Sequence, residues 1–366
     1  MKLNKYLNRI LDDATQILKT GNKQQAVQYL SNICNKKPDN ADLPREIGIF
    51  FQQNNMPFKA EMFYRNSLSI NNNQASIYFN LGVIYQNINK TEQAIKAYLE
   101  AVEVSPDYSK AFANLGYLYN EIGDKENCRL ACLKAQQLEP DNPQIKHMIA
   151  ALGIEPLPDT ADQQYIKDLY KNYADHYDDH LSVTLKSKVP ELIFDTTLKF
   201  LPNKTTDKVL LDLGCGTGIC GQLFNQHVNK MMGVDLSEEM IEEARKKNSY
   251  CELTVSDITE YLNGNGKLFD IIISSDVLIY IGKLQAVFNG VYNALKDGGL
   301  FAFSIESSLS SDDDFILDST GRYKHNAKYI SRIAELSGFS ILSSDELALR
   351  QQNQHNVMGR IYILNK

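Results

Sequence analysis

The sequence predicts two domains, an all-α solenoid of helical repeats followed by a doubly wound α/β domain with a mostly parallel sheet. A chain of 366 residues exceeds what one ordinary hydrophobic core accommodates. In its first half similar residues recur at one constant spacing along the chain, which indicates stacked helical hairpins. In its second half short apolar runs alternate with helical segments, as expected for parallel strands joined by crossover helices. The expected division is 1–152 for the repeats, 153–161 for a linker and 162–366 for the α/β domain.

The composition excludes several classes of protein. An apolar fraction of 43% with 23% charged residues is typical of a globular chain. No apolar run approaches the roughly 20 residues that a membrane helix needs. The N-terminus also lacks the apolar centre of a signal peptide. We therefore expect a cytoplasmic protein without a membrane partner. The net charge of −7 argues against nucleic-acid binding.

The six cysteines predict neither disulfides nor a metal site. A chain without a secretory signal is not expected to carry a disulfide framework. Cys128 and Cys132 share one face of a predicted helix and His147 follows them, but a metal site needs more ligands than these. We interpret this pair of cysteines as buried helix-packing residues and expect no bound metal.

The clearest repeat spans residues 75–108, and its aromatic and small residues recur one period later in 109–142. Fainter copies precede it, so about four units of one length extend over residues 7–142. The unit resembles the tetratricopeptide repeat, in which small residues such as Gly82 let two antiparallel helices approach closely. Each hairpin buries its apolar face against its neighbours, and the helix over residues 144–152 is expected to cap the array.

Tetratricopeptide arrays usually present a concave surface to a protein or peptide, and the resemblance implies an unidentified partner of that kind. The residues expected on this surface are Phe79, Asn80, Val83, Lys110, Asn114 and Tyr117. Asn80 and Lys110 occupy positions used by repeats that clamp a C-terminal carboxylate, whereas Asp42 and Glu46 depart from that clamp. The alternative is that the array packs on the α/β domain or on another copy of the chain.

Five apolar runs in the second half are expected to form the parallel strands. They span residues 209–214, 231–236, 251–257, 269–277 and 299–306. The runs 340–349 and 357–364, separated by a polar tip, predict a hairpin on the sheet edge. The polar connection 306–324 is long enough for a lid or a partly disordered loop.

A glycine-rich loop, Asp212-Leu-Gly-Cys-Gly-Thr-Gly218, completes the first of these strands. Glycines at the carboxyl end of a strand let the backbone pass close to a ligand. Gly216, Gly218 and Gly221 also satisfy G-x-G-x-x-G, the fingerprint of dinucleotide binding. That fingerprint alone is weak, so the surrounding acidic residues have to decide between cofactors.

The acidic residues favour a different cofactor from a nicotinamide dinucleotide. Asp212 precedes the glycines, Asp235 ends the second strand, and Asp257 ends the third. The carboxylate after the second strand can bind ribose hydroxyls in either cofactor class, so it discriminates little. With the segments 269–277 and 295–300, these residues resemble the five ordered motifs of class I S-adenosylmethionine-dependent methyltransferases, which have a Rossmann-like fold.

The resemblance implies S-adenosylmethionine as the cofactor and S-adenosylhomocysteine as its product. In that family the glycine loop cradles the cofactor, the first acid orients its amino-acid end, and the third acid with its apolar neighbour holds the adenine. The residues carried over to cofactor binding are Tyr173, Tyr177, Asp212, Leu213, Gly214, Cys215, Gly216, Gly218, Asp235, Leu236, Met240, Ser256, Asp257, Ile258, Ser274 and Ser275.

Each of these assignments has a structural alternative. Asp235 and Asp257 could each precede a helix, where the helix dipole favours an acid. Tyr173 and Tyr177 could pack a helix. The chain also resembles, over nearly its whole length, predicted bacterial methyltransferases that carry tetratricopeptide repeats, but their substrates do not follow from that likeness.

Methyl transfer from a sulfonium depends on aligning the nucleophile and excluding water rather than on a catalytic triad. If a base acts, the candidates are Asp276, Tyr280 and His325, since histidine titrates near neutrality. Arg322 and Tyr323 are candidates for substrate binding, Arg322 for an anionic group. The simpler interpretations are that His325 is an ordinary surface residue and that the glycine before Arg322 only forms a turn.

The leading hypothesis is methyl transfer from S-adenosylmethionine to an unidentified acceptor, either a small molecule or a protein recruited by the repeats. Residues 275–278 read Ser-Asp-Val-Leu where amide- and base-methylating enzymes carry Asn-Pro-Pro-Tyr, which argues against those acceptors. The alternative is an interaction or scaffold protein whose cofactor-binding domain is not catalytic. The intact glycines and acids argue against it, and a dehydrogenase is the third hypothesis.

Overall fold

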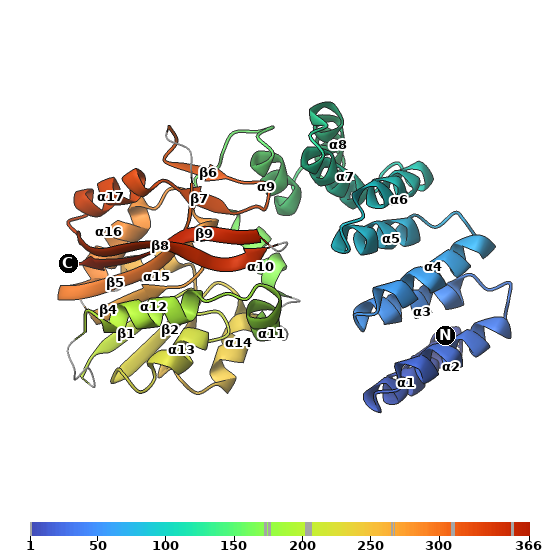
Figure 1. The fold of residues 1–366 in the computed structure, drawn as a ribbon, viewed down its shortest axis with the longest axis horizontal. Helices are drawn as coiled ribbons and strands as arrows, with labels where there is room; N and C mark the ends of the chain where they lie inside the picture. The colour runs from blue at the N-terminus through green and yellow to red at the C-terminus, as the bar shows by residue number, and fades with distance from the viewer. Residues whose placement is uncertain are drawn as a thin grey trace. The chain divides into compact units, whose positions relative to one another are not determined.

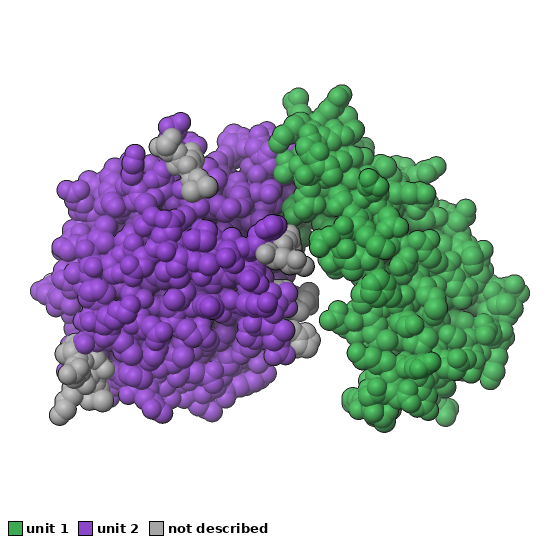
Figure 2. All heavy atoms as spheres, in the orientation of Figure 1, with its two compact units in different colours: residues 1–145 green, residues 146–366 purple. Residues whose placement is uncertain are grey.

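A computed structural model describes residues 2–171, 174, 177–201, 207–264, 266, 268–308, 312–352 and 355–366. The chain forms two compact units, Met1–Ile145 and Lys146–Lys366 (Figure 2). The first unit is helical, and the second contains a mixed sheet covered by helices (Figure 1). Within the described residues, every helix is too short or too polar to cross a membrane.

Helices α1 to α8 pack as consecutive hairpins in the first unit (Figure 1). Their bounds are α1 Lys2–Lys19, α2 Lys23–Asn35, α3 Asp42–Gln53, α4 Pro57–Ile70, α5 Ala75–Asn87, α6 Thr91–Val104, α7 Ser109–Glu121 and α8 Lys125–Leu138. The second helices of three successive hairpins begin at Pro57, Thr91 and Lys125, so each starts one full repeat after the previous one. This constant spacing confirms the predicted repeat.

A glycine in the first helix of three hairpins faces a larger side chain in the second helix. The three pairs are Gly48–Tyr64, Gly82–Tyr98 and Gly116–Cys132. A Cβ atom at the glycine would lie only 2.4 or 2.5 Å from the partner side chain. Any residue larger than glycine would therefore force the two helices apart. The cysteines on α8 are buried in this packing, as predicted.

The two tyrosines also carry a repeated set of buried hydrogen bonds. Tyr98 Oη donates to Gln86 Oε1 at 2.9 Å and accepts from Asn114 Nδ2 at 2.9 Å. Tyr64 makes the same two bonds with the glutamine and the asparagine one period earlier. Burial raises the pKa of both tyrosines well above the ordinary value. The repeat thus extends to the polar contacts of the packed helices.

Some residues predicted for the concave surface are engaged within the repeats themselves. Asn80 donates to Tyr64 Oη at 3.1 Å, and the Phe79 ring packs edge-on against Tyr108. Lys110 is exposed. Binding of a partner at this surface stays a prediction.

Helix α9 (Pro143–Ala151) begins in the first unit but belongs mainly to the second. His147 Nε2 lies 2.8 Å from the carbonyl oxygen of Gly321, and its ring stacks on Tyr165 with centroids 4.2 Å apart. Ala150 packs in an apolar cluster with Tyr280. The helix predicted to cap the repeats therefore contributes from residue 146 onward to the core of the second unit.

The segment predicted as a linker, 153–161, is held against the second unit. Ala161 N donates to Tyr280 O at 2.9 Å. The backbone N–H groups of residues 282 and 283 both donate to Asp159 O at 2.9 Å, and Tyr323 Oη donates to Pro158 O at 2.9 Å. Its two prolines have no backbone N–H, so most of these bonds are donated to its carbonyl oxygens by other elements.

The second unit continues with helices and strands in alternation. Their bounds are α10 Gln163–Lys171, α11 Tyr177–Asp179, η2 His180–Thr184, α12 Val189–Leu198, β1 Val209–Leu213, α13 Ile219–Phe224, β2 Lys230–Asp235, α14 Glu238–Lys246, β3 Glu252–Val255, α15 Ile258–Gly264, β4 Phe269–Ser274, η3 Leu278–Tyr280, α16 Gln285–Ala294, β5 Leu295–Ser307, β6 Phe315–Leu317, β7 Tyr323–His325, α17 Ala327–Leu336, β8 Ser340–Gln352 and β9 His355–Asn365.

The sheet has the order β3-β2-β1-β4-β5-β7-β6. Strands β1 to β5 pair in parallel, whereas β9 pairs antiparallel with both β5 and β8. The five predicted parallel strands and the terminal hairpin are confirmed. The strand order reverses between β1 and β4, and ligands of such sheets bind outside the carboxyl ends of the strands near that point.

Apolar side chains pack on both faces of the sheet. The larger cluster includes Phe288 of α16 and Ile330 of α17, and the smaller one includes Ile193 of α12 and Phe224 of α13. The connection 306–324, predicted as a lid or loop, contains β6 and reaches β7, which pairs with the end of β5. Residues 309–311 lie outside the described part of the chain.

Candidate active site

The loop after β1 requires glycine for two reasons. The backbone is left-handed at Gly214, with φ +71°, and also at Gly216 and Gly218. Residues with a Cβ rarely adopt this conformation. A Cβ at Gly214 would also lie 2.2 Å from the side chain of Val277. The loop therefore passes close to the residues that follow β4.

Acidic residues end three adjacent strands beside this loop. Asp212 lies in β1, Asp235 ends β2 and Asp257 follows β3, so the strand order brings all three to one edge of the sheet. Asp235 accepts hydrogen bonds from Gly216 N and Ser237 N, each at 2.9 Å. Burial raises the pKa of Asp235, and these N–H groups oppose that shift.

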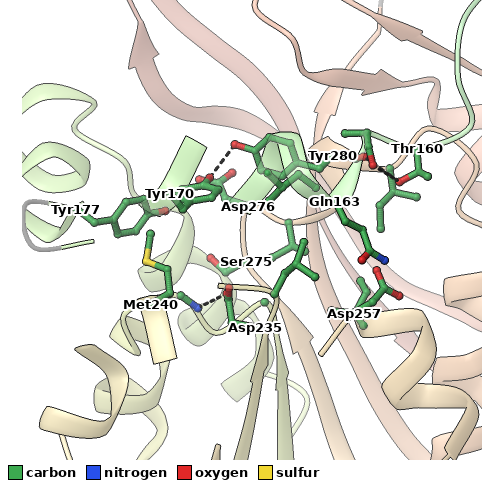
Figure 3. A pocket seen from close by; sticks show the side chains of 18 residues that line it. Thr160, Gln163, Tyr170, Tyr177, Asp235, Met240, Asp257, Ser275, Asp276 and Tyr280 are labelled. Atoms are coloured by element: carbon green, nitrogen blue, oxygen red, sulfur yellow. Dashed lines mark hydrogen bonds between the residues drawn. The ribbon is translucent and has the colours of Figure 1, made fainter. Parts of the chain in front are cut away.

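Asp257 combines the two interpretations that the sequence left open. Its Oδ1 accepts from Thr259 N at 2.8 Å and from Glu260 N at 3.1 Å, so it caps the start of α15. The same residue lines the main pocket of the second unit, beside Ile258 (Figure 3). Capping the helix and facing the pocket are therefore compatible.

The main pocket encloses about 830 Å³, including solvent at its mouth, which is within the usual size of a small-molecule site. Figure 3 shows side chains from α10, α11 and the ends of β2, β3 and β4 around it. It is lined by Thr160, Ala161, Gln163, Ile166, Tyr170, Tyr177, Gly214, Gly216, Asp235, Leu236, Met240, Asp257, Ile258, Ser275, Asp276, Val277, Tyr280 and Ile281. Most residues predicted to bind cofactor or to catalyse are brought together here.

Of the pocket residues that precede β1, the sequence predicted Tyr177 and missed the earlier ones. Thr160, Ala161, Gln163, Ile166 and Tyr170 line the pocket, but they belong to the predicted linker or to an ordinary amphipathic helix. No motif marked them. The prolines shortly before Thr160 were the only local signal that this segment has a set position.

A second, smaller hollow adjoins the first, since both are lined by Gly214, Gly216, Tyr177, Ser275 and Asp276. Its further lining residues are Leu181, Pro190, Asp212, Cys215, Thr217, Ile219 and Cys220. The first acid of the glycine motif thus lies at this hollow rather than at the larger pocket.

Asp212 is completely buried. Its Oδ2 accepts a hydrogen bond from Tyr250 Oη at 2.7 Å. Burial raises the pKa of the Asp212 carboxyl to about 7, although the tyrosine bond opposes the shift. The site therefore holds a carboxyl group that titrates near neutrality.

Three of the predicted catalytic and substrate-binding residues lie near one another beyond β4. Tyr280 Oη and Tyr170 Oη are 2.7 Å apart at the pocket wall (Figure 3). Arg322 is close enough to Tyr280 and Asp276 for both to raise its pKa, although burial opposes the shift. The guanidinium places a positive charge on this side of the pocket.

Asp276 is held by an ion-pair network that the sequence did not indicate. Arg350 of β8 lies 3.4 Å from Asp276 Oδ1 and also pairs with Glu306 at the end of β5. Arg322 approaches the same Glu306 carboxylate at 4.0 Å. Asp276 N donates to Ser304 Oγ at 2.9 Å, and the backbone of Asp276 is left-handed with φ +57°. Such strain persists only where neighbours over-determine the conformation.

His325 and Tyr323 do not line either hollow. His325 is fully buried in β7, and its Nε2 bonds the carbonyl oxygens of Ile281 and Gly282 at 2.9 and 3.1 Å. Burial lowers the pKa of the imidazole to about 4, so it is neutral near pH 7. The segment forms a strand and not the expected polar loop, because β7 pairs with β5. Tyr323, also buried, donates to a backbone carbonyl.

The remaining predicted cofactor residues that the structure describes do not line either hollow. Leu213 and Ser274 are buried within β1 and β4, and Gly218 precedes α13. Ser256 Oγ donates to the backbone of the next residue at 3.1 Å. Tyr173 lies outside the described residues.

Asp178 of α11 forms an ion pair with the residue after α14 and a hydrogen bond with the glycine loop. Lys247 Nζ lies 2.6 Å from Asp178 Oδ2, and Thr217 Oγ1 donates to Asp178 Oδ1 at 2.5 Å. Asp178 neighbours the pocket residue Tyr177. The pair thus fixes this short helix beside both hollows.

Comparisons with known proteins agree with this geometry. Residues 204–355 match the family described as Methyltransferase domain, and 75–108 and 109–142 each match a Tetratricopeptide repeat family. The chain therefore carries a methyltransferase domain, preceded by tetratricopeptide repeats. The first repeats, residues 7–74, are outside the matched segments.

Individual relatives match only part of the chain. A protein of Haemophilus influenzae is 33% identical over 127 residues, 32% of this chain and 48% of that protein. A ubiquinone biosynthesis O-methyltransferase of Coxiella burnetii is 28% identical over 150 residues, 39% of this chain and 64% of that enzyme. The chain thus spans about half to just under two thirds of the length of these relatives.

Among solved structures, magnesium protoporphyrin IX methyltransferase from Synechocystis with bound S-adenosylhomocysteine is 16% identical. The likeness covers 56% of this chain and 99% of that chain, with a TM-score of 0.44.

Proposed function

We propose that the chain transfers a methyl group from S-adenosylmethionine to an acceptor that enters the pocket beside Asp276 and Tyr280. The observation that carries this proposal is the alignment of Asp212, Asp235 and Asp257 at one sheet edge beside a glycine loop. Three carboxylates and a closely approaching backbone suit a ligand with an ammonium group, a ribose and an adenine.

The residues present fit such a cofactor. Asp235 would accept from the ribose hydroxyls, and Asp257 with Ile258 would hold the adenine. The glycine loop and Asp212 would hold the amino-acid end, since one oxygen of Asp212 has no hydrogen-bond partner among the described residues. When bound, the cofactor supplies an activated methyl group on a sulfonium, so the protein need only align the acceptor and exclude water.

Asp276 and Tyr280 are the groups we assign to the acceptor. Arg350 on one side and a left-handed backbone on the other fix the Asp276 carboxylate at the pocket wall. That carboxylate can accept a proton or a hydrogen bond from the acceptor nucleophile. Arg322 would bind an anionic group of the acceptor. Arg322 does not line the pocket itself, but its charge acts on Tyr280 and Asp276 at the pocket wall. His325 and Tyr323 receive no role, because both are buried outside the pocket and bond to backbone carbonyls.

We further propose that the repeats recruit a protein, through the surface that carries Lys110 and Asn114. Tetratricopeptide arrays bind proteins in this way, and Lys110 is exposed. The functional division into repeats at 1–152, a connecting segment at 153–161 and a methyltransferase domain at 162–366 belongs to the same proposal.

The first test is calorimetric titration of S-adenosylhomocysteine into the full chain. We expect micromolar or tighter binding, and a loss of roughly 100-fold in Asp235→Asn, because about two hydrogen bonds to a charged acceptor weaken. Asp270→Asn is the matched control: Asp270 begins β4 at the opposite end of the strands and pairs with Lys208 and Lys296. It should leave binding unchanged.

Transfer is tested separately with S-adenosylmethionine labelled in the methyl group and a cell extract fractionated into proteins and small molecules. Label in either fraction supports the enzyme and indicates the acceptor class. Absence of binding to the wild-type chain would overturn the proposal. Binding without transfer to any fraction would favour a scaffold protein with a non-catalytic cofactor domain.

A further inference from the structure

Tyr250 lies beneath the glycine loop, just before β3, at a position that no sequence motif marks. Its ring occupies the space that side chains at three glycines would need. A Cβ at Gly221 would lie 2.5 Å from the ring, and one at Gly218 or Gly233 would lie 3.0 or 3.1 Å from it. The glycine loop and the start of α13 therefore pack directly against the ring.

The hydroxyl of Tyr250 forms a hydrogen bond, whereas its ring only packs. It donates to Asp212 Oδ2 at 2.7 Å. Asp212 Oδ1 is buried and has no hydrogen-bond partner among the described residues. An ionised carboxylate with one oxygen unsatisfied in an apolar setting is costly unless a cation or donor reaches it.

The described residues that line the hollows near Asp212 supply other acidic groups. Asp235 faces it from β2, and Cys215 and Cys220 face it from the loop and α13. Tyr177 and Asp276 line the same smaller hollow. Neither Lys nor Arg is among the described residues that line the two hollows. The cations that contact lining residues are already paired, Lys247 with Asp178 and Arg350 with Glu306 and Asp276. A positive charge for Asp212 Oδ1 would therefore have to come from a ligand.

We propose that Tyr250 is a positioning residue, whose hydroxyl holds the Asp212 carboxylate ionised and oriented to receive the ammonium group of the cofactor's amino-acid end. The inference rests on the proposed function. Recognition of the amino-acid end then depends on the Tyr250 hydroxyl through Asp212, whereas Asp235 and Asp257 bind the adenosine end.

The arrangement predicts that binding of the amino-acid end is linked to a proton. Burial raises the pKa of Asp212 to about 7, above the value of an exposed aspartate. A nearby ammonium group favours the ionised form, so binding below about pH 7 expels a proton. Affinity for ligands with the ammonium group should therefore rise as pH increases toward 7 and level off above it.

Two ligands separate the hydroxyl's role from a structural one. S-adenosylhomocysteine has the amino-acid end, whereas 5′-methylthioadenosine has the adenosine and lacks that end. Both are titrated into the full chain and into Tyr250→Phe, which keeps the ring and removes the hydroxyl, between about pH 6 and 8. Tyr292→Phe on α16, remote from both hollows, is the matched control.

For Tyr250→Phe we expect roughly tenfold weaker S-adenosylhomocysteine binding at pH 7, because a hydrogen bond to a charged group is lost. Its pH dependence should move to higher pH, and binding of 5′-methylthioadenosine should stay within about twofold of wild type. Equal losses for both ligands would assign Tyr250 a merely structural role and overturn the inference. So would unchanged binding of both ligands.

The outcomes are distinguishable from failure of the proposed function. If the wild-type chain binds neither ligand, the proposed function fails and this inference fails with it. If the wild-type chain binds both and its preference for S-adenosylhomocysteine survives in Tyr250→Phe, only the inference fails.

Discussion

The two units of the molecule use the same kind of close contact over very different distances along the chain. In the repeats, Gly82 and Tyr98 lie on consecutive helices, and a Cβ at the glycine would lie 2.4 Å from the ring. In the second unit, β2, β3 and β4 all intervene between Gly214 and Val277, and the corresponding distance is 2.2 Å. The first contact joins neighbouring helices of one hairpin, and the second joins the ends of two adjacent strands beside the pocket.

This difference separates stability from ligand binding. A contact within one hairpin recurs in each repeat, so it stabilises the array without defining a single site. A contact between the ends of β1 and β4 occurs once, and it shapes the backbone that faces the proposed cofactor. Substitutions at the two glycines should therefore have separable effects.

The largest effect is expected for Gly214→Ala. The left-handed backbone and the overlap with Val277 together cost about 3 kcal/mol. We expect at least roughly 100-fold weaker binding of S-adenosylhomocysteine, measured by calorimetry. The melting of the repeats, followed as a separate calorimetric transition, should not change. Retention of wild-type affinity would show that the loop can relax around a methyl group. The contact at Gly214 would then not be needed for ligand binding.

Gly82→Ala is expected to act in the opposite way. The added methyl overlaps the Tyr98 ring, so the repeats should lose about 2 kcal/mol of unfolding free energy. Urea unfolding followed by helical circular dichroism measures this loss. Gly123→Ala is the control for losing a glycine: it has φ +79° with open space around it, so only backbone strain remains. Affinity for S-adenosylhomocysteine should stay within about twofold in both variants.

Asp212→Asn sharpens the comparison, because it should weaken cofactor binding and raise the stability of the fold. A buried carboxyl with a raised pKa stabilises the fold fully below its unfolded pKa of about 4. That contribution is lost as pH rises through the folded value of about 7. The asparagine removes the cost of a buried charge, so at pH 8 the variant should melt about 3 °C or more above wild type. The gain should shrink toward pH 5. A variant that melts below wild type at pH 8 would contradict the shifted pKa.

The smallest effect is expected for Tyr64→Phe and Tyr98→Phe. Each removes one hydroxyl from a buried pair of hydrogen bonds and should cost about 1 kcal/mol. Since the two tyrosines have equivalent neighbours one period apart, the two losses should agree within about 0.5 kcal/mol. Urea unfolding of both variants tests this agreement. Unequal losses would show that the repeats are not equivalent in energy.

Much of the fold could be predicted because its signals are local. The repeat is visible as a spacing in the chain, and each parallel strand is a short apolar run. The glycine loop and the acids Asp235 and Asp257 could be found because each lies at the carboxyl end of a strand, where ligands of such sheets bind.

The other half of the site could not be predicted, because its residues are ordinary in sequence. Tyr170 lies on an amphipathic helix, and Thr160 lies in a segment that looks like a linker. Arg350 comes from an antiparallel hairpin and meets Asp276 only because β9 pairs with β5. His325 has a suitable chemistry for a base, yet strand pairing buries it away from the pocket.

The sequence by itself therefore determined the two architectures and the glycine loop, since each depends on spacing along the chain, and its resemblance to methyltransferases indicated the cofactor class. Only the tertiary structure decided which side chains face one another: that Tyr250 donates to Asp212, that Arg350 holds Asp276, and that His325 stays neutral. The physical reason is that burial and hydrogen bonding, which set the charge of a group, depend on neighbours distant in sequence.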